Sequence, residues 1–185
     1  MDLSKIGLSD VRGRKHGLRI IPQDPVLFAG SLRDCLDPFR TESDEALLDA
    51  LKAVNHFGWD RGVDALNAHV DEGGANYSVG ERQLLCLARA IVEEPRVLVM
   101  DEASASLDNE SDKKIQSMLR NRFRNTTMLT IAHRLDTILD YDSILVLDEG
   151  RVVEFGPPQQ LLENPDGFFS ILVGQGSSNS SFHRE

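Results

Sequence analysis

Two apolar runs separated by a helical pattern constrain the fold of this 185-residue chain more than any other feature. The first, "RVLVM", covers residues 96–100, and the second, "TTMLTIA", covers residues 126–132. Continuous apolar runs of this length are typical of strands buried on both faces of a parallel sheet. Between them, "SDKKIQSMLRNRF" at residues 111–123 has the spacing of an amphipathic helix. Strand, helix and strand in this order predict an α/β domain with a parallel sheet.

Further strands and helices are predicted on both sides of this unit. "LRIIPQDPVLF" reads as a short strand around residues 20–21, which Pro22 and Pro25 break into a loop. "SILVLDEGRVVEF" predicts two strands joined by a tight turn at Glu149 and Gly150. "PPQQLLENP" and "DGFFSILV" predict two short helices, and the composition of "GQGSSNSSFHRE" predicts a disordered tail.

Residues 31–94 predict a mostly helical lobe. "SDEALLDALKAV" begins at a Ser43 N-cap, and its apolar residues at 47, 48, 51 and 54 indicate one buried helix face. Residues 59–75 are expected to be irregular. A second helix is predicted within "NYSVGERQLLCLARAI", residues 76–91, with apolar residues at 84, 87, 88 and 91 on one face. Ser78 and Glu81 have the S-x-x-E spacing of a capping box.

Charge and apolar content narrow the classes of partner. The chain has 20 basic and 30 acidic residues and a net charge of -10, so we expect neither nucleic acid nor an anionic membrane surface as a partner. No apolar run reaches the ~18 residues of a membrane-spanning helix, and "MDLSKIGLSD" is too polar for a signal peptide. Cys35 and Cys86 are too few for a disulfide framework or a metal set.

Polar residues follow three of the predicted strands. Gln23 follows the first, Asp101 and Glu102 follow "RVLVM", and His133 follows "TTMLTIA". Ligands of open α/β sheets collect at the carboxyl ends of the strands. Together these side chains offer a metal-binding acid, a second acid able to orient water, and groups able to contact a phosphate oxygen.

Four motifs then occur in a familiar order: "PQDPVLF", "YSVGERQ", "VLVMDEASASLD" and "TIAHR". They resemble the Q-loop, signature, Walker B with D-loop, and H-loop of ATP-binding-cassette ATPases. The resemblance extends from about residue 2 to residue 174. The flanking "SKIGL", "CLDPF", "TIAHRLDTILDYD" and "ILVLDEGRVVEFGPP" are similar to the second nucleotide-binding domain of multidrug-resistance-associated exporters.

The resemblance implies a role for each matching residue. Gln23 would sense the γ-phosphate and magnesium and couple to the membrane domains, and Asp101 would hold magnesium. Glu102 would polarise the attacking water, and His133 would contact the γ-phosphate. The implied cofactors are ATP and Mg²⁺, and the implied location is the cytoplasmic face of a membrane.

The resemblance also implies a second nucleotide-binding domain as partner. Asp108 would belong to the D-loop that crosses the interface between the two domains. Ser78 and Gly80 would face the γ-phosphate of a nucleotide bound to the other domain. Val79 and Glu81 depart from the family's strong signature, L-S-G-G-Q. For Glu81 we favour a capping-box role over direct contact with nucleotide.

One motif of this family is absent from the 185 residues. A phosphate-cradling loop needs G-x-x-x-x-G-K-S/T, and none of the five lysines follows a glycine. In the family, the strand before this loop lies between the strands that end near His133 and begin near Ile144. Without it, two apolar strand edges are expected to be exposed. We therefore expect the chain by itself to bind and hydrolyse Mg-ATP weakly or not at all.

The expected fold is thus a truncated P-loop NTPase (RecA-like) parallel sheet of the ABC ATPase type, with an inserted helical lobe and without the Walker A strand. The sheet core would comprise about residues 1–22 and 96–174. Residues 23–95 would hold the Q-loop, lobe and signature helix, and residues 175–185 a disordered tail.

Three hypotheses for function remain at this stage. The first is part of an ATPase domain that powers transmembrane export. The second is a non-catalytic fragment that docks on an intact nucleotide-binding domain. The third, a soluble cassette ATPase of DNA repair or translation, is disfavoured because "PQDPVLFAGSLRDCLDP" resembles exporters specifically.

Overall fold

The computed structural model describes residues 7, 13, 16–54, 59–101, 109–132 and 135–179. The chain forms two compact units, residues 1–131 and residues 132–185. The elements of the first unit are, in order, β1 (Leu18–Ile21), β2 (Gly30–Ser31), α2 (Leu32–Leu36), α3 (Asp44–Ala53), η2 (Trp59–Arg61), α4 (Val63–Leu66), β3 (His69–Val70), η3 (Glu72–Gly74), α5 (Val79–Glu93), β4 (Val97–Asp101), α6 (Asn109–Arg122) and β5 (Thr127–Ile131).

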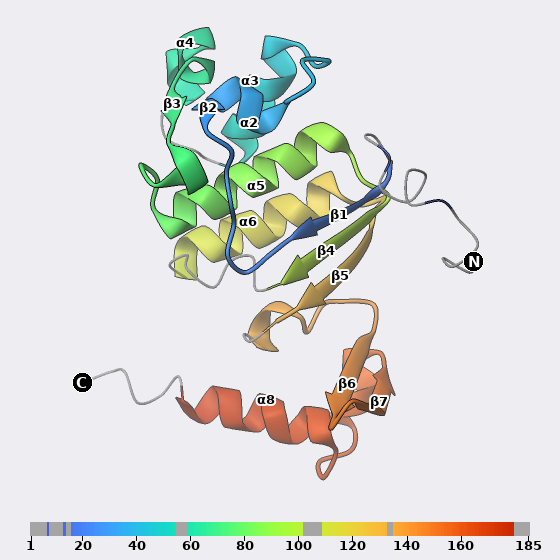
Figure 1. Ribbon diagram of the computed structural model, residues 1–185. Helices are drawn as coiled ribbons and strands as arrows, with labels where there is room; N and C mark the ends of the chain where they lie inside the picture. Colours follow the sequence, from blue (N-terminus) through green and yellow to red (C-terminus); the bar gives the residue numbers. More distant parts are fainter. Residues whose placement is uncertain are drawn as a thin grey trace. The chain divides into compact units, whose positions relative to one another are not determined.

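A parallel three-stranded sheet of order β1-β4-β5 organises the first unit. Helices α5 and α6 lie on one side of this sheet (Figure 1). Alternate strand residues enter the core on that side, including Ile21, Leu98 and Met100, where they join apolar residues of both helices. The predicted α/β unit with a parallel sheet is therefore confirmed.

The second face of this sheet differs from the prediction. Both apolar runs were expected to be buried on both faces, but Leu129 and Ile131 of the second run are 57% and 54% exposed. Ile20 of β1 is also exposed, at 62%. These residues lie on one face, because Ile20 pairs with Val99 and Val99 pairs with Leu129. Within the described part of the unit, the helices that pack on the sheet cover only the opposite face. The apolar runs are typical of a sheet covered on both faces, whereas the described helices of this unit cover only one face.

The helical segments pack in the same unit as the sheet. Helix α3 begins at the predicted Ser43 cap, whose Oγ accepts a hydrogen bond from the N–H of Ala46. Residues 59–75 are not simply irregular, since they form η2, α4, β3 and η3. These elements span two to four residues each, which is too short for apolar periodicity to reveal. Helix α2, with a Ser31–Asp34 capping box, was also missed.

Helix α5 spans 15 residues and confirms the predicted helix after Ser78. It packs against α2, α3 and β1. Its buried residues are Gln83, Leu85, Leu87, Ala88, Ala90 and Ile91. Leu84, predicted on the buried face, is only partly buried. Arg19 of β1 forms an ion pair with Glu93 in the last turn of α5.

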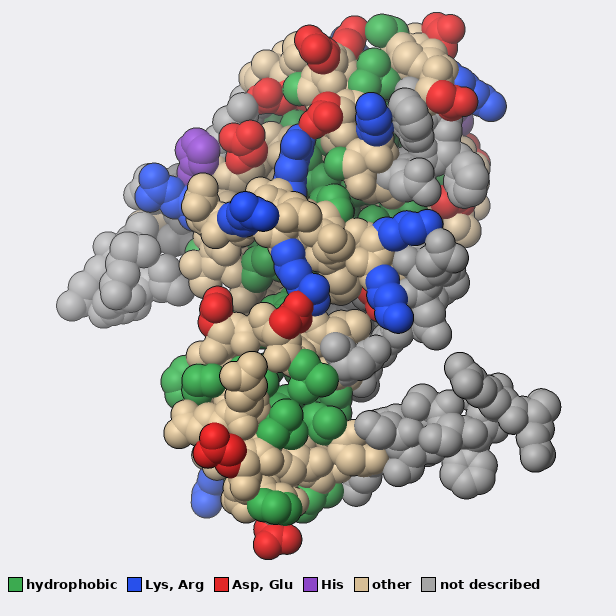
Figure 2. Space-filling view, turned by 180° about the vertical axis from the view of Figure 1, so that it is seen from behind, with side chains coloured by type: hydrophobic (Ala, Val, Ile, Leu, Met, Phe, Trp, Pro, Cys, Tyr) green, Lys and Arg blue, Asp and Glu red, His purple; other side chains and the backbone are tan. Residues whose placement is uncertain are grey.

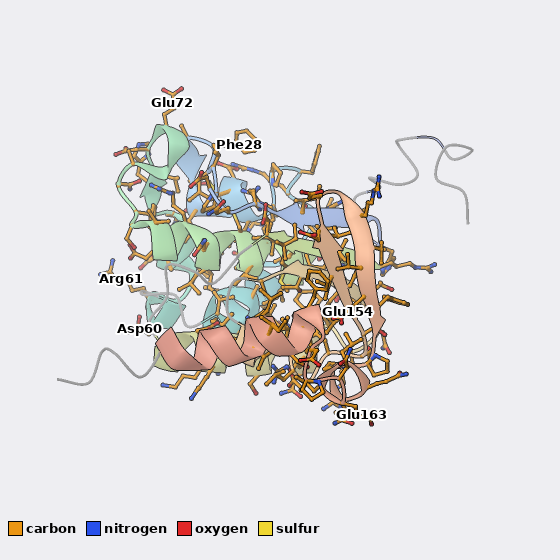
Figure 3. All side chains as sticks on the ribbon, turned by 90° about the horizontal axis from the view of Figure 1, so that it is seen from below. Phe28, Asp60, Arg61, Glu72, Glu154 and Glu163 are labelled. Carbon is orange, nitrogen blue, oxygen red and sulfur yellow. The ribbon has the colours of Figure 1, made fainter. Side chains whose placement is uncertain are left out.

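The second unit contains η4 (Leu135–Thr137), β6 (Ile144–Asp148), β7 (Arg151–Gly156), α7 (Pro158–Leu162) and α8 (Phe168–Asn179). Strands β6 and β7 form the predicted hairpin, with positive φ at Glu149 and Gly150. Glu154 of β7 accepts hydrogen bonds from the N–H groups of Phe168 and Phe169 and so caps α8 (Figure 3). Hydrophobic side chains gather on the surface of this unit (Figure 2).

The start of the predicted disordered tail differs from the structure. Helix α8 continues to Asn179, so residues 175–179 are helical where composition predicted a disordered tail. Residues 180–185 lie outside the described residues. The described strands form three separate sheets: β5 is an edge strand of the first, β2 and β3 form the second, and β6 and β7 form the third. The break between β5 and β6 falls where the resemblance places an additional strand.

Candidate functional site

The carboxyl ends of β1 and β4 bring two predicted site residues to one edge of the sheet. Ile21 pairs with Met100 in parallel register. Gln23 follows the end of β1 by two residues, and Asp101 is the last residue of β4. Gln23 is exposed, and Asp101 is half-buried where it pairs with Ile131 of β5. An amide and a carboxylate at this edge are oxygen donors of the kind that Mg²⁺ prefers.

Two donors of this kind would leave the remaining positions around a magnesium ion to other oxygen ligands. Magnesium is commonly held by one or two carboxylates rather than by an all-protein cage. The described ranges contain no group of three His, Cys, Asp or Glu side chains placed to hold a metal. The predicted residues Glu102, Asp108 and His133 lie outside the described residues.

The first turn of α5 presents the other predicted ligand groups. Ser78 is exposed and Gly80 is half-buried. The predicted capping box is present: the N–H of Glu81 donates to Ser78 Oγ at 3.2 Å, and the N–H of Ser78 donates to Glu81 Oε2 at 2.8 Å. The Ser78 hydroxyl also donates to Glu81 Oε2 at 2.7 Å. The capping role favoured for Glu81 is therefore confirmed.

One turn further along α5, Gln83 contacts the segment that follows β1. Its Nε2 donates a hydrogen bond to the carbonyl oxygen of Gln23 at 3.2 Å. The Gln83 side chain is 1% exposed, at a helix position that lines the core together with Leu87. Sequence reasoning missed this residue, although a polar residue four positions before a buried leucine is a usable signal.

A hollow of about 330 Å³ lies between β1, the segment after it, and α5. Its lining includes Ile20, Val26, Phe28, Cys86 and Arg89. The Arg89 guanidinium lies 5.9 Å from the centre of the Phe28 ring, and its Nε donates to the carbonyl oxygen of Cys35 at 2.7 Å. Arg19, Asp24 and Glu93 also line this hollow, so its apolar walls carry charges of both signs.

Both cysteines are free thiols near this hollow. Cys35 is buried and donates to the carbonyl oxygen of Phe28 at 2.9 Å. Burial raises the pKa of Cys35 and of Cys86, and the charge of Arg89 opposes that change at both. The two thiols are therefore protonated at neutral pH and serve packing rather than nucleophilic chemistry.

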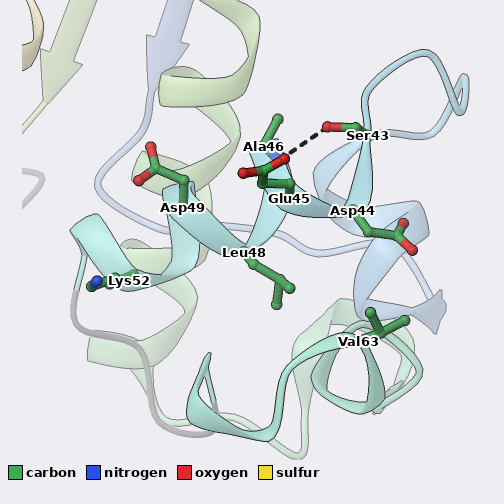
Figure 4. A pocket seen from close by; sticks show the side chains of 8 residues that line it. All are labelled: Ser43, Asp44, Glu45, Ala46, Leu48, Asp49, Lys52 and Val63. Carbon is green, nitrogen blue, oxygen red and sulfur yellow. Dashed lines mark hydrogen bonds between the residues drawn. The ribbon is translucent and has the colours of Figure 1, made fainter.

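A second, wider hollow borders α3 and contains no predicted site residue (Figure 4). Its rim carries Asp44, Glu45 and Asp49, and the side chains of Leu48 and Val63 point toward one another across it (Figure 4). Asp44 and Asp49 already form ion pairs with Arg33 and Arg122. We therefore interpret this hollow as a solvent-exposed surface on which two of the three carboxylates are already ion-paired.

No helix among the described residues is long and apolar enough to cross a membrane. The family model described as "ABC transporter" matches residues 2–105 of the chain. "ABC transporter C family member 3" of Dictyostelium discoideum is 48% identical over 99% of this chain. "ATP-binding cassette sub-family C member 2" of Mus musculus is 47% identical over the whole chain. This chain spans only 13% and 12% of the length of those two relatives.

The fold is also found among solved structures. A structure described as "a bacterial Atm1-family ABC exporter with ATP bound" superposes with a TM-score of 0.77 and 35% sequence identity. The match covers 85% of this chain and 28% of the exporter chain. The mixed α/β architecture with a parallel sheet is thus of the ABC ATPase type.

Proposed function

Because this chain belongs to the ABC transporter family and resembles its subfamily C members, we propose that it is part of a nucleotide-binding domain that hydrolyses Mg-ATP to drive export across a membrane. The observation that carries the proposal is the register of β1 and β4. It sets Gln23 and Asp101 at the same carboxyl edge of a parallel sheet, where nucleotides bind in open α/β folds.

Each predicted site residue has a defined part in the proposed reaction. Asp101 and the Gln23 amide hold magnesium, directly or through water. Glu102 accepts the proton of the attacking water, and His133 donates a hydrogen bond to a γ-phosphate oxygen. Bound Mg-ATP supplies the phosphoanhydride bond that is cleaved. Positioning and charge stabilisation provide most of the catalysis in phosphoryl transfer.

Two partners complete the proposed machinery. A second nucleotide-binding domain supplies the nucleotide that faces Ser78 and Gly80, and Asp108 lies in the segment that meets that domain. A helix N-terminus is a suitable anion contact because its N–H groups and dipole favour negative charge. The hollow beside Phe28 and Arg89 receives a segment of the transmembrane domains, which is how nucleotide chemistry reaches the transport path.

The chain by itself is proposed to be a poor ATPase. Its sequence contains no G-x-x-x-x-G-K-S/T loop, so no lysine reaches the terminal phosphates from a glycine-rich turn. The test is to express the chain alone and fused after a segment that supplies this loop and its strand. We expect Mg-ATPase activity from the fusion only, and its loss in the Glu102→Gln variant of the fusion. Equal activity of the fusion with and without Glu102→Gln removes Glu102 from the role of general base.

A second candidate function is a non-catalytic docking fragment. The observation that favours it is the exposed first turn of α5, since Ser78 and Gly80 need no phosphate loop of their own chain. In this case the chain alone binds an intact, ATP-loaded nucleotide-binding domain. Sequencing upstream of the Met1 codon separates the two candidates. An in-frame sequence that encodes the G-x-x-x-x-G-K-S/T loop, preceded by apolar membrane-spanning segments, favours the ATPase. An in-frame stop codon upstream of Met1, with the 185-residue protein detectable in cells, favours the fragment.

A further inference from the structure

The segment after β1 is held at both ends by side chains of α5. At its start, Gln83 Nε2 donates to the carbonyl oxygen of Gln23. At its end, Arg89 lies over the ring of Phe28. These two α5 residues are six positions apart, which is about 9 Å along a helix. Figure 1 shows the segment passing across α5.

The burial of Gln83 is the unusual part of this arrangement. An amide side chain at a core position destabilises a fold unless it is hydrogen-bonded. Leucine is the ordinary residue at such a position, as at Leu87 one turn later. Gln83 instead bonds to a backbone group 60 residues away in the sequence. A buried polar contact of this kind specifies one arrangement of two segments more than it adds to total stability.

We propose that Gln83 is a positioning residue that fixes the backbone of Gln23 relative to the first turn of α5. Gly80 lies three residues before Gln83. About one turn of α5 therefore separates the residue that binds the Gln23 carbonyl from the first turn of the helix, which contains Ser78 and Gly80 of the signature motif. Gln23 and the pair Ser78 and Gly80 then move as one body, although they serve different nucleotides. This inference rests on the proposed function for its catalytic consequence, while the link itself is a property of the chain alone.

Limited proteolysis of the full 185-residue chain tests the link without nucleotide. Chymotrypsin cleavage after exposed Phe28 reports local opening of the segment, and cleavage after buried Phe123 reports opening of the core. We expect Gln83→Leu to raise the Phe28-to-Phe123 cleavage ratio about fivefold, because it removes the hydrogen bond to the Gln23 carbonyl. The control Leu87→Met, on the same helix face, leaves the ratio unchanged. An unchanged ratio in both Gln83→Leu and Gln83→Met overturns the proposal.

A pH series separates the hydrogen bond from packing. In Gln83→Glu the side chain can donate to the Gln23 carbonyl only when it is protonated, and burial raises its pKa. The cleavage ratio of this variant should rise between pH 6 and pH 8.5, because ionisation of the carboxyl removes the donor. Gln83→Leu should show the raised ratio at both pH values. A ratio for Gln83→Glu that does not depend on pH contradicts a positioning hydrogen bond.

The catalytic consequence is measured in the fusion that restores the phosphate loop. Gln83→Leu should lower kcat, and the double variant with Gln23→Ala should be no slower than Gln23→Ala alone, because Gln83 acts through Gln23. Additive losses overturn the positioning role. If the wild-type fusion lacks ATPase activity, the proposed function fails, and the proteolysis result alone decides the link.

Discussion

Glu81 Oε2 accepts two hydrogen bonds from Ser78, one from its backbone N–H at 2.8 Å and one from its hydroxyl at 2.7 Å. Both are donors that an anion at the start of α5 would use. The carboxylate also places a negative charge where the helix dipole would otherwise attract a phosphate. The capping box thus stabilises α5 and opposes phosphate binding with the same side chain.

Replacing Glu81 by glutamine should separate these two effects. Glutamine preserves the capping geometry but removes the charge, so we expect unfolding free energy to change by less than about 0.5 kcal/mol. Affinity for an intact nucleotide-binding domain loaded with Mg-ATP should rise about threefold to tenfold, as expected for removing a charge at a helix N-terminus. Titration calorimetry with the ATP-loaded domain measures it.

Glu81→Ala is the matched control for this substitution. It removes the same charge and also the hydrogen bond from the Ser78 N–H to Glu81 Oε2, while the Ser78 cap itself remains. We expect it to destabilise the chain by about 0.5–1 kcal/mol. Both variants should bind the ATP-loaded domain more tightly than the wild type. Weaker binding by Glu81→Gln would mean that Glu81 itself contacts the nucleotide or the partner, contrary to the capping interpretation.

Helix caps, turn residues and prolines correctly predicted the elements whose ends are marked by nearby side chains. The Ser43 and Ser78 caps, the hairpin at Glu149, and β1 ending before Pro22 all follow from side chains within a few residues of each boundary. Parallel order in the sheet also followed, because two apolar strands flanked a helix. The placement of Gln23 and Asp101 at one edge is a consequence of that order.

Contacts between residues far apart in the sequence could not be predicted from the sequence pattern. Nothing near Gln83 indicates that its amide reaches Gln23, since that contact depends on how α5 packs on the segment after β1. The exposure of Leu129 has the same origin, because an apolar run reports what a strand is suited to contact rather than what covers it. The contacts by which the helices of residues 31–94 share a core with the sheet are of the same long-range kind.

Alanine substitutions at Gly73 and Gly74 test how tightly the residues just before α5 are packed. Both have positive φ, +67° and +73°, so alanine at either is strained by about 1 kcal/mol. A Cβ at Gly73 has open space, but at Gly74 it would lie 2.8 Å from Arg82 Cδ and 3.1 Å from Leu27 Cδ1. Gly74→Ala should therefore cost about 1–2 kcal/mol more than Gly73→Ala in urea unfolding. Equal losses would show that Arg82 moves aside freely.

The two thiols predict a loss of stability in alkaline solution. Burial raises the pKa of Cys35 and Cys86 in the folded chain above the ordinary value of 9.0. Their contribution is fully present below the unfolded pKa, near pH 9, and is lost as pH rises through the folded values. Burial raises the pKa of Tyr77 as well, which adds a loss in the same direction at higher pH.

Urea unfolding between pH 6 and pH 10.5 measures this dependence. We expect the contribution of these three groups to the unfolding free energy to be constant from pH 6 to 8 and to decline above about pH 9. Cys35→Ala combined with Cys86→Ala lowers stability at pH 7 because it removes packed side chains. The same double variant should decline less steeply above pH 9. An identical slope with and without the thiols would assign the alkaline loss to other groups.

The open face of the sheet predicts self-association of the chain as given. Ile20, Leu129 and Ile131 form an exposed apolar row across β1 and β5, and β5 is an edge strand. Apolar edge strands pair readily with other chains. Leu129→Thr combined with Ile131→Thr keeps β-propensity while removing apolar area. Sedimentation velocity over a range of concentrations should show a smaller associated fraction for this variant than for the wild type.

Val26→Thr is the matched control for the sheet-face variant, because Val26 is also exposed but lies outside the sheet. It should leave association unchanged, which separates a sheet-specific effect from a general loss of surface hydrophobicity. Because the strand pattern fits a sheet covered on both faces, fusing the phosphate-loop segment should suppress association as effectively as the threonine pair does. Association that persists in both proteins would place the contact elsewhere on the chain.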